Sequence, residues 1–334
     1  MKASELTKAL ESLIDSKIPC FVWGSPGVGK SSLVSQIAKS KDMNFIDLRL
    51  SLLDPTDLRG IPFFNAEDKS AVWAKPEFFP PSDSKEYGIL FLDEINSAPP
   101  TIQAAAYQLI LDRKVGEYTL PINYAIVAAG NKETDRGVTY RMPTPLANRF
   151  VHLDFDLDFD SWKVWAYQAN IDYRIISYLN YKKENLFLFD ASSNKKAFAT
   201  PRSWSFVNDI LNSSLDISLY AQVIGGTIGS ETANEFLSYL NVMNELPNID
   251  DILNKADIEI PTNNSVLYAL CSGLVYALKQ NNSIKNIDTI LEFSFNLPSE
   301  FSVMLIQDMQ KNDISIEHSV LWEKWVEKYS FLLG

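Results

Sequence analysis

The chain has 334 residues, of which 46% are hydrophobic, so it is long enough for two domains and apolar enough for a sizeable core. Its formal net charge is −12 at pH 7, which argues against a broad nucleic-acid-binding surface, because neutralising phosphates requires clustered Lys and Arg. Its two cysteines, Cys20 and Cys271, lack the spacing of zinc ligands, which argues against a zinc site and makes a reducing cytoplasm the expected location.

The first segment of the chain predicts an amphipathic helix. Leu6, Leu10, Leu13 and Ile14 share one helical face, and charged residues interrupt them, so the segment lacks the pattern of a signal peptide. No uncharged apolar run in the sequence reaches the ~18 residues that cross a membrane. We therefore expect no membrane span.

The next element is a glycine-rich stretch that fits the phosphate-binding pattern G-x-x-x-x-G-K-[ST]: Gly24-Ser25-Pro26-Gly27-Val28-Gly29-Lys30-Ser31. Residues 18–23 before it predict a short buried strand, and residues 32–38 after it have helical spacing. In this context the backbone N–H groups would close around phosphates at a helix N-terminus. Lys30 would reach the β- and γ-phosphates and the Ser31 hydroxyl would ligate Mg²⁺. The sequence therefore predicts a site for ATP and Mg²⁺ with nucleotide contacts from Gly24 through Ser32.

The rest of the first half alternates strands and helices. The predicted strands are apolar on both faces, which indicates a parallel sheet covered by helices on both sides. We expect this α/β nucleotide-binding domain to span residues 1–156. After the phosphate loop, strands are expected at 44–50, 88–94, 124–129 and 150–155, with a helix at 101–111.

Two acids, Asp93 and Glu94, end the apolar run 89–92. Successive side chains of a strand point to opposite faces, so neighbouring acids at its end can have different roles. Asp93 can complete the Mg²⁺ shell beside Ser31, and Glu94 can polarise the attacking water. A cation would offset the repulsion between the two carboxylates.

The second half, residues 157–334, has a helical pattern and is expected to form a helical lid with a C-terminal helical extension. We interpret its tryptophan pairs, Trp162 with Trp165 and Trp322 with Trp325, as core packing, and His152 in the preceding strand as structural. The clearer helices are 203–211, 232–246, 266–280 and 300–311. Loops are expected at the Asn/Asp-rich joints 248–251, 262–264 and 281–288.

The combined motifs resemble those of AAA+ ATPases, specifically the MoxR family. The string Asp-Glu-Ile-Asn-x-Ala-Pro-Pro is specific to this branch, whereas a phosphate loop alone is not. The resemblance covers roughly residues 20–205 and implies a P-loop AAA+ core. The matching stretches are Gly24 through Ser31, Asp93 through Pro100, Ala128 through Asn131, Pro145 through Phe150, and Thr200-Pro201-Arg202.

The resemblance implies roles for further residues. Asn131, at a strand end, would orient the water as the sensor 1 residue. Arg149 would project into the site of a neighbouring subunit as an arginine finger, a role for which Arg136 and Arg141 are rivals. Arg202, after a proline at a helix start, would reach the γ-phosphate from the second domain as the sensor 2 residue.

Two segments leave alternatives open. Residues 58–81 resemble an insertion of this branch, and their Val72 and Trp73 either pack on the core or line the central opening of a ring. The core interpretation is favoured because buried apolar residues are the commoner case. The hairpin-like segment 115–120 has the same ambiguity.

The expected function is Mg²⁺-dependent ATP hydrolysis by a homo-oligomeric ring, a hexamer by resemblance, that remodels or activates a partner protein. The resemblance also implies a partner with a von Willebrand factor A domain. One alternative is a motor or loader acting on nucleic acid, which the net charge of −12 disfavours. Another is a nucleotide-gated scaffold without turnover, which the combination of Glu94, Asn131 and Arg149 disfavours.

Overall fold

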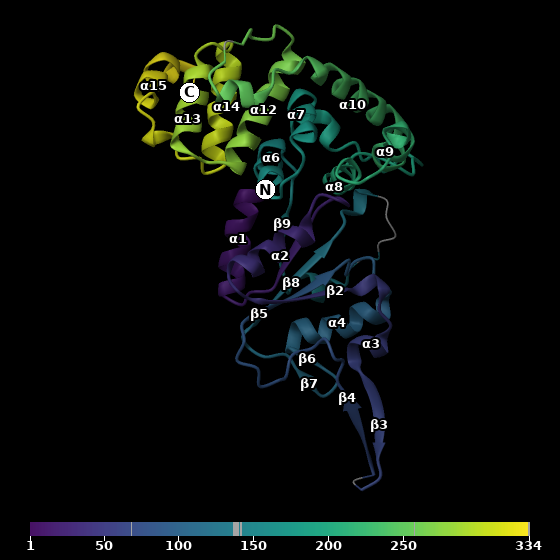
Figure 1. Cartoon of the computed structure of the whole chain (residues 1–334). Coiled ribbons are helices and arrows are strands. Elements are labelled where there is room, and N and C mark those ends of the chain that lie inside the picture. Colours follow the sequence, from purple (N-terminus) through teal and green to yellow (C-terminus); the bar gives the residue numbers. More distant parts are fainter. Residues whose placement is uncertain (68, 136–139, 141, 257, 333–334) are drawn as a thin grey trace. The chain divides into compact units, whose positions relative to one another are not determined.

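A computed structural model of the chain describes all residues except 68, 136–139, 141, 257 and 333–334 (Figure 1). The described chain divides into two compact units. The first comprises Met1–Asp158 with the short segment Asp190–Asn194, and the second comprises Phe159–Phe189 with Lys195–Gly334.

The first unit is built on a parallel sheet. In the described part of the chain, five strands form this sheet in the order β2-β5-β8-β1-β9. The two central strands β5 and β8 are buried along their whole length, which explains their uninterrupted apolar sequence. The strands are β1 (Cys20–Trp23), β2 (Asn44–Arg49), β5 (Gly88–Asp93), β8 (Tyr124–Gly130) and β9 (Val151–Asp154).

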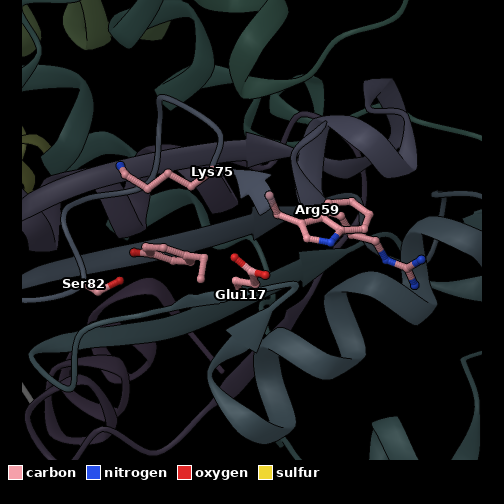
Figure 2. A pocket seen from close by; sticks show the side chains of 6 residues that line it. Arg59, Lys75, Ser82 and Glu117 are labelled. Carbon is pink, nitrogen blue, oxygen red and sulfur yellow. The ribbon is translucent and has the colours of Figure 1, made fainter. Parts of the chain in front are cut away.

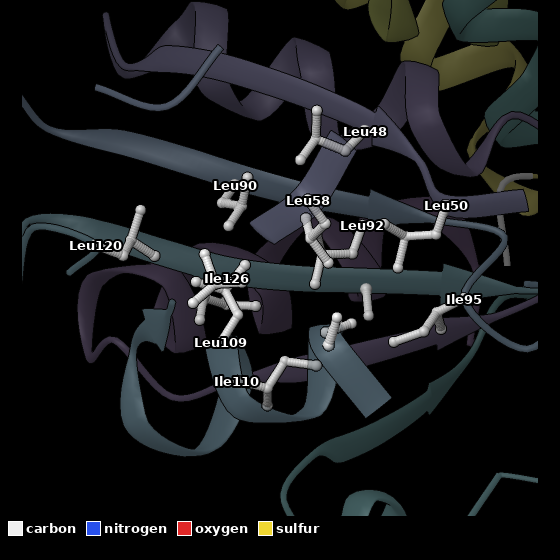
Figure 3. Packing of buried hydrophobic residues seen from close by; sticks show 14 of the residues in the cluster. Leu48, Leu50, Leu58, Leu90, Leu92, Ile95, Leu109, Ile110, Leu120 and Ile126 are labelled. Carbon is white, nitrogen blue, oxygen red and sulfur yellow. The ribbon is translucent and has the colours of Figure 1, made fainter. Parts of the chain in front are cut away.

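Helices cover both faces of this sheet. On one face, Leu90, Leu92 and Ile126 pack with Leu109 and Ile110 of α4 in a single apolar cluster (Figure 3). The alternate strand side chains point to the other face, which α1 and α2 cover. The expected fold class, a parallel α/β P-loop core followed by a helical part, is confirmed. The helices of this unit are α1 (Ala3–Asp15), α2 (Lys30–Ser40), α3 (Pro55–Arg59), α4 (Pro100–Asp112) and α5 (Thr144–Ala147).

Two small hairpins belong to the first unit. In the hairpin of β3 (Ile61–Asn65) and β4 (Ser70–Ala74), Phe64 is 75% exposed and Val72 is 44% exposed. The favoured core interpretation is therefore wrong for Val72, because this two-stranded ribbon extends away from the main sheet (Figure 1). In the hairpin of β6 (Lys114–Val115) and β7 (Tyr118–Thr119), Val115 and Tyr118 are buried in the core cluster, so that segment is a core element.

In the residues that the structure describes, the second unit consists of helices joined by loops and contains no strand. Its centre is α12 (Asn264–Gln280), which packs against α7 (Tyr173–Tyr181) and α14 (Ser299–Lys311). The remaining helices are α6 (Phe159–Gln168), α8 (Pro201–Leu211), α9 (Tyr220–Ile228), α10 (Ser230–Val242), α11 (Ile249–Leu253), α13 (Ile284–Ser294) and α15 (Trp322–Tyr329).

All three of the expected loops in this unit are partly helical, since α12 begins at Asn264, within 262–264. Helix α11 covers 249–251, and α13 begins within 281–288. The polar residues in these joints are N-caps: the Asn248 side chain accepts a hydrogen bond from the backbone of Asp250, and that of Ser283 accepts one from Asn286. Asn and Ser favour both loops and helix starts, so composition alone misassigned these segments.

The tryptophans of the second unit pack as expected. Trp162 and Trp325 are buried, while their partners Trp165 and Trp322 are half-buried. The rings of Trp322 and Trp325 stack at 5.7 Å, and the Trp325 indole donates to Ser302 Oγ at 3.0 Å. Core packing with a satisfied indole N–H is the usual state of a buried tryptophan.

A buried ion pair connects α6 and α14. Lys163 Nζ lies 2.6 Å from Asp308 Oδ1, and both side chains are almost fully buried. Burial raises the pKa of Asp308, and the Lys163 ammonium opposes that rise. The attraction between the two charges therefore offsets part of the hydration free energy that each loses on burial.

We predict that Lys163→Met lowers the free energy of unfolding by about 3–5 kcal/mol, because it leaves the Asp308 carboxylate buried without a partner. The double variant Lys163→Met/Asp308→Leu should lose less than the single variant. The matched control is Lys255→Met, which breaks an exposed pair with the same 2.6 Å separation from Glu292 and should cost at most about 1 kcal/mol. Urea unfolding checks all three, and equal losses in the two single variants would contradict the prediction.

Candidate nucleotide site

The polar residues that follow the strands of the first unit meet at one edge of its sheet. The strands are parallel, so their carboxyl ends lie together, which is where open α/β sheets bind ligands. The register pairs Trp23 with Gly130 and Leu92 with Ala128, so β1, β8 and β5 end at nearly the same level. We call the group of Lys30, Ser31, Asp93, Glu94 and Asn131 at this edge the strand-end site.

The phosphate loop connects β1 to α2 in the expected strand–loop–helix context. Gly27 and Gly29 have φ angles of 79° and 102°, which side chains other than that of glycine rarely tolerate. A Cβ on Gly24 would lie 3.3–3.4 Å from Val28, Lys30 and the Phe155 carbonyl. The glycines thus let the backbone turn tightly into the N-terminus of α2, with Gly29 as its N-cap.

Lys30 connects the loop to the end of β8. Its ammonium donates to the carbonyl oxygens of Gly24 at 2.6 Å and Ser25 at 3.1 Å, and to Asn131 Oδ1 at 3.0 Å. The side chain is only 8% exposed. The Lys30 ammonium and the Asn131 side-chain amide therefore lie next to each other beside the phosphate loop.

Asp93 and Ser31 form an oxygen pair suited to a divalent cation. Ser31 Oγ lies 3.4 Å from Asp93 Oδ2, and the carboxylate is 5% exposed. Burial raises the pKa of Asp93; the Lys30 charge opposes this rise and the Glu94 charge adds to it. Hydroxyl and carboxylate oxygens are ligands that Mg²⁺ accepts, and a cation would stabilise this buried carboxylate in its charged form. The donor set therefore fits Mg²⁺.

Glu94 leaves the strand in an unusual conformation. Strand β5 ends at Asp93, one residue earlier than expected, and Glu94 has a φ of 56° in the left-handed region. The two acids thus diverge because the chain turns after Asp93, and not only because strand side chains alternate. Non-glycine residues in this region cluster at functional sites, where the surrounding structure holds them.

Two residues at the end of β2 hold the Glu94 carboxylate: Arg49, the last residue of the strand, and Ser51, just after it. The sequence did not assign a role to either. Ser51 Oγ donates to Glu94 Oε2. Arg49 Nε lies 3.7 Å from Glu94 Oε1, and Arg49 Nη2 lies 3.9 Å from Asp93 Oδ2. The signal that could have found them is their position at the end of an expected strand, but it has meaning only once β2 is known to pair with β5.

A third contact that the sequence did not indicate fixes the phosphate loop from outside. Ser25 Oγ donates to Asp135 Oδ1 at 3.1 Å, and the Lys132 backbone N–H donates to Asp135 Oδ2 at 3.2 Å. Asp135 lies just after the end of β8, so it ties the loop to the segment that follows Asn131.

The two expected arginines that the structure describes, Arg149 and Arg202, are both exposed. Arg149 is exposed after α5, and its guanidinium has no hydrogen bond or ion pair with any residue that the structure describes. Arg202 is exposed in the first turn of α8 in the other unit, where Thr200 caps the helix and Pro201 opens it as expected. Arg136 and Arg141 lie outside the described residues.

His152 has structural contacts, in agreement with the sequence. Its Nδ1 accepts a hydrogen bond from the Trp23 indole at 2.9 Å, so its Nε2 carries the proton and donates to the Ala147 carbonyl at 2.8 Å. Cys20 and Cys271 are buried thiols, and burial raises the pKa of Cys20 to about 12. Within the described residues, His, Cys, Asp and Glu form no cluster of three that could hold a metal ion, and no helix is long and apolar enough to cross a membrane.

A separate pocket of about 210 Å³ lies at the base of the β3–β4 hairpin (Figure 2). Its lining shares no residue with the strand-end site, so we do not assign the nucleotide to it. The lining residues are Arg59, Trp73, Lys75, Ser82, Glu117 and Tyr118.

Comparison with known families supports the nucleotide assignment. Residues 19–152 match the model of the ATPase family associated with various cellular activities (AAA). The match covers less than half of the chain, but it runs from before β1 into β9 and so includes every residue of the strand-end site. It supports an AAA+ ATPase domain in this part of the chain.

Several solved structures are distantly similar to this chain. A Cytophaga hutchinsonii protein described provisionally as an ATPase is 15% identical over 90% of this chain and 79% of its own, with a TM-score of 0.39. Thermotoga maritima RuvB, a Holliday junction branch migration motor, is 19% identical over 75% and 74%, with a TM-score of 0.38. Brucella abortus NtrX is 12% identical over 93% and 67%, with a TM-score of 0.35. These values are too low to support any functional argument.

We predict that Ser51→Ala lowers ATP turnover about tenfold, or ~1.4 kcal/mol in the barrier, with the ATP dissociation constant nearly unchanged. The reason is that Glu94 loses its hydrogen-bond donor while the phosphate loop stays intact. Ser40→Ala is the control, because its hydroxyl caps a carbonyl at the far end of α2. Steady-state phosphate release measures the turnover, and nucleotide titration measures the ATP dissociation constant. Parent-like turnover in Ser51→Ala would exclude this role.

Proposed function

We propose that the protein is a Mg²⁺-dependent ATPase of the MoxR type that works as a homo-oligomeric ring. The observation that carries the proposal is the convergence of Lys30, Ser31, Asp93, Glu94 and Asn131 at the strand-end site. Phosphate ligands, cation ligands, a candidate base and an amide arise there from three different strand ends. A glycine-rich turn that only reversed the chain would not require these other polar groups beside it.

Each group has one chemical task in this proposal. The loop N–H groups and Lys30 bind the β- and γ-phosphates. Ser31 with Asp93 would hold Mg²⁺, whose charge would offset the negative charge of the phosphates. Glu94, held by Ser51 and Arg49, orients the attacking water and accepts its proton. The Asn131 amide orients the same water against the γ-phosphate.

The arginine finger role of Arg149 is supported by its exposure. A guanidinium without a partner among the described residues of its own chain is free to enter a site on a neighbouring copy. The active form would then be an oligomer, and the family resemblance favours a hexamer. Arg202, exposed at the start of α8, would sense the nucleotide from a lid formed by the helical residues 157–334.

The work of the ring would be remodelling or activation of a protein partner in the cytoplasm, in the manner of a chaperone. The exposed apolar residues Phe63, Phe64 and Val72 of the β3–β4 hairpin offer a surface for contact with such a partner. The family resemblance points to a partner with a von Willebrand factor A domain. The net charge of −12 disfavours the alternative of a nucleic-acid motor, and the held Glu94 disfavours a scaffold without turnover.

We predict that Lys30→Ala abolishes both ATP binding and hydrolysis, whereas Glu94→Gln keeps binding and loses at least ~100-fold in turnover, because the amide cannot accept a proton. Nucleotide titration and phosphate release separate the two effects. Glu86→Gln, an exposed acid of the same unit outside the site, is the control. A Glu94→Gln protein with the parent rate would refute the assignment of the base.

We predict that a mixture of Arg149→Ala and Glu94→Gln subunits regains activity that neither variant has alone. In the mixed oligomer, an intact Glu94 can face an intact Arg149 of the neighbour, which restores one complete site. Phosphate release is measured after subunit exchange has been shown with fluorescently labelled protein. No recovery despite exchange would reject a finger acting between subunits.

A further inference from the structure

Asn96 is a buried amide directly behind the strand-end site. It lies in the turn after Glu94 and is 2% exposed. Its Nδ2 donates a hydrogen bond to the backbone carbonyl of Asn131 at 2.8 Å, and its own backbone carbonyl accepts one from the Tyr140 N–H at 2.6 Å. Asn96 therefore contacts two segments that are far from it in the sequence.

The space around this amide is specifically shaped. A Cβ on Gly130, the last residue of β8, would lie 2.3 Å from Asn96 Oδ1, so any larger residue at 130 would displace the side chain. The same Oδ1 is buried and has no hydrogen-bond partner among the described residues. An unsatisfied buried acceptor costs about 1–3 kcal/mol, so packing alone does not account for an asparagine here.

The two hydrogen bonds connect Asn96 to two segments with different proposed roles. Asn131, whose backbone Asn96 holds, directs its Oδ1 to Lys30 of the phosphate loop. Tyr140, on the other side, precedes α5 and the exposed Arg149. Because the Asn96 side chain and backbone are parts of one buried residue, these two hydrogen bonds connect Asn131 to Tyr140 through a single residue.

We propose that Asn96 is a positioning residue that fixes the Asn131 amide at the nucleotide and couples it to the segment ending in Arg149. This inference rests on the proposed function of the strand-end site. Through Asn96, the nucleotide bound in one subunit would affect the position of Arg149, which that subunit presents to its neighbour.

The test uses Asn96→Ala with Gln103→Ala as the matched control. Gln103 is also a buried amide of the first unit, 4% exposed. Its Nε2 donates to the Ala98 carbonyl at 3.1 Å, and its side chain has no hydrogen bond to the described residues of the strand-end site. Both variants lose one buried amide hydrogen bond, so a merely structural role predicts the same phenotype for both. Gly130→Ala, which displaces the Asn96 side chain, is the second variant if Asn96→Ala does not fold.

Two readouts distinguish coupling from stability. In steady-state kinetics, Asn96→Ala should lower kcat at least ~10-fold with KM changed less than ~3-fold, while Gln103→Ala stays within ~2-fold of the parent in both. In hydrogen–deuterium exchange, Mg²⁺ with the non-hydrolysable analogue AMP-PNP should protect the backbone of 142–150 in the parent and in Gln103→Ala, but not in Asn96→Ala.

The outcomes separate this inference from the proposed function. Protection of 142–150 that persists in Asn96→Ala, or is absent in the parent despite AMP-PNP binding, would overturn the coupling. Equal losses of kcat in Asn96→Ala and Gln103→Ala would overturn the positioning role. A parent protein that shows Asn96-dependent protection but no ATP hydrolysis would refute the ATPase proposal while supporting the coupling.

Discussion

The parallel pairing of β1, β8 and β5 is the constraint on which the rest of the site depends. Because all three strands run in the same direction and end at nearly the same level, the residues that follow them share one edge of the sheet. One strand contributes the phosphate loop, the next an amide, and the third a pair of acids. Helices packed on both faces make this edge a rigid platform, so the distances within the site follow from backbone register.

The second determinant is the balance of charge at that edge. Asp93, Glu94 and the neighbouring Asp47 bring negative charge together; burial raises the pKa of Asp47, and the Asp93 charge raises it further. Lys30 and Arg49 oppose this repulsion from two sides, one buried and one half exposed. The acids are thereby kept close together at the sheet edge.

The site also contains locally unfavourable features that the core sustains. Glu94 adopts a left-handed conformation, and Asn96 buries an acceptor without a partner in the described chain. Each costs of order 1–3 kcal/mol, whereas burial of a single Leu of the core below contributes about 1.5–3 kcal/mol. The apolar cluster of Leu90, Leu92 and Leu109 thus stabilises a geometry that the turn alone would not adopt.

The sequence by itself determined the phosphate loop, the acids after an apolar strand, the alternating α/β pattern and the helical second half, because these are local signals of spacing and residue type. It misassigned 249–251 and 284–288 as loops, since the side chains that cap these helices, Asn248 and Ser283, are also favoured in loops. Only the tertiary structure decided that β2 pairs with β5, which brings Arg49 and Ser51 to Glu94. It also decided that the Asn96 side chain donates a hydrogen bond to the Asn131 carbonyl. These contacts depend on which strands are neighbours, and strand order is set by packing between segments distant in the chain.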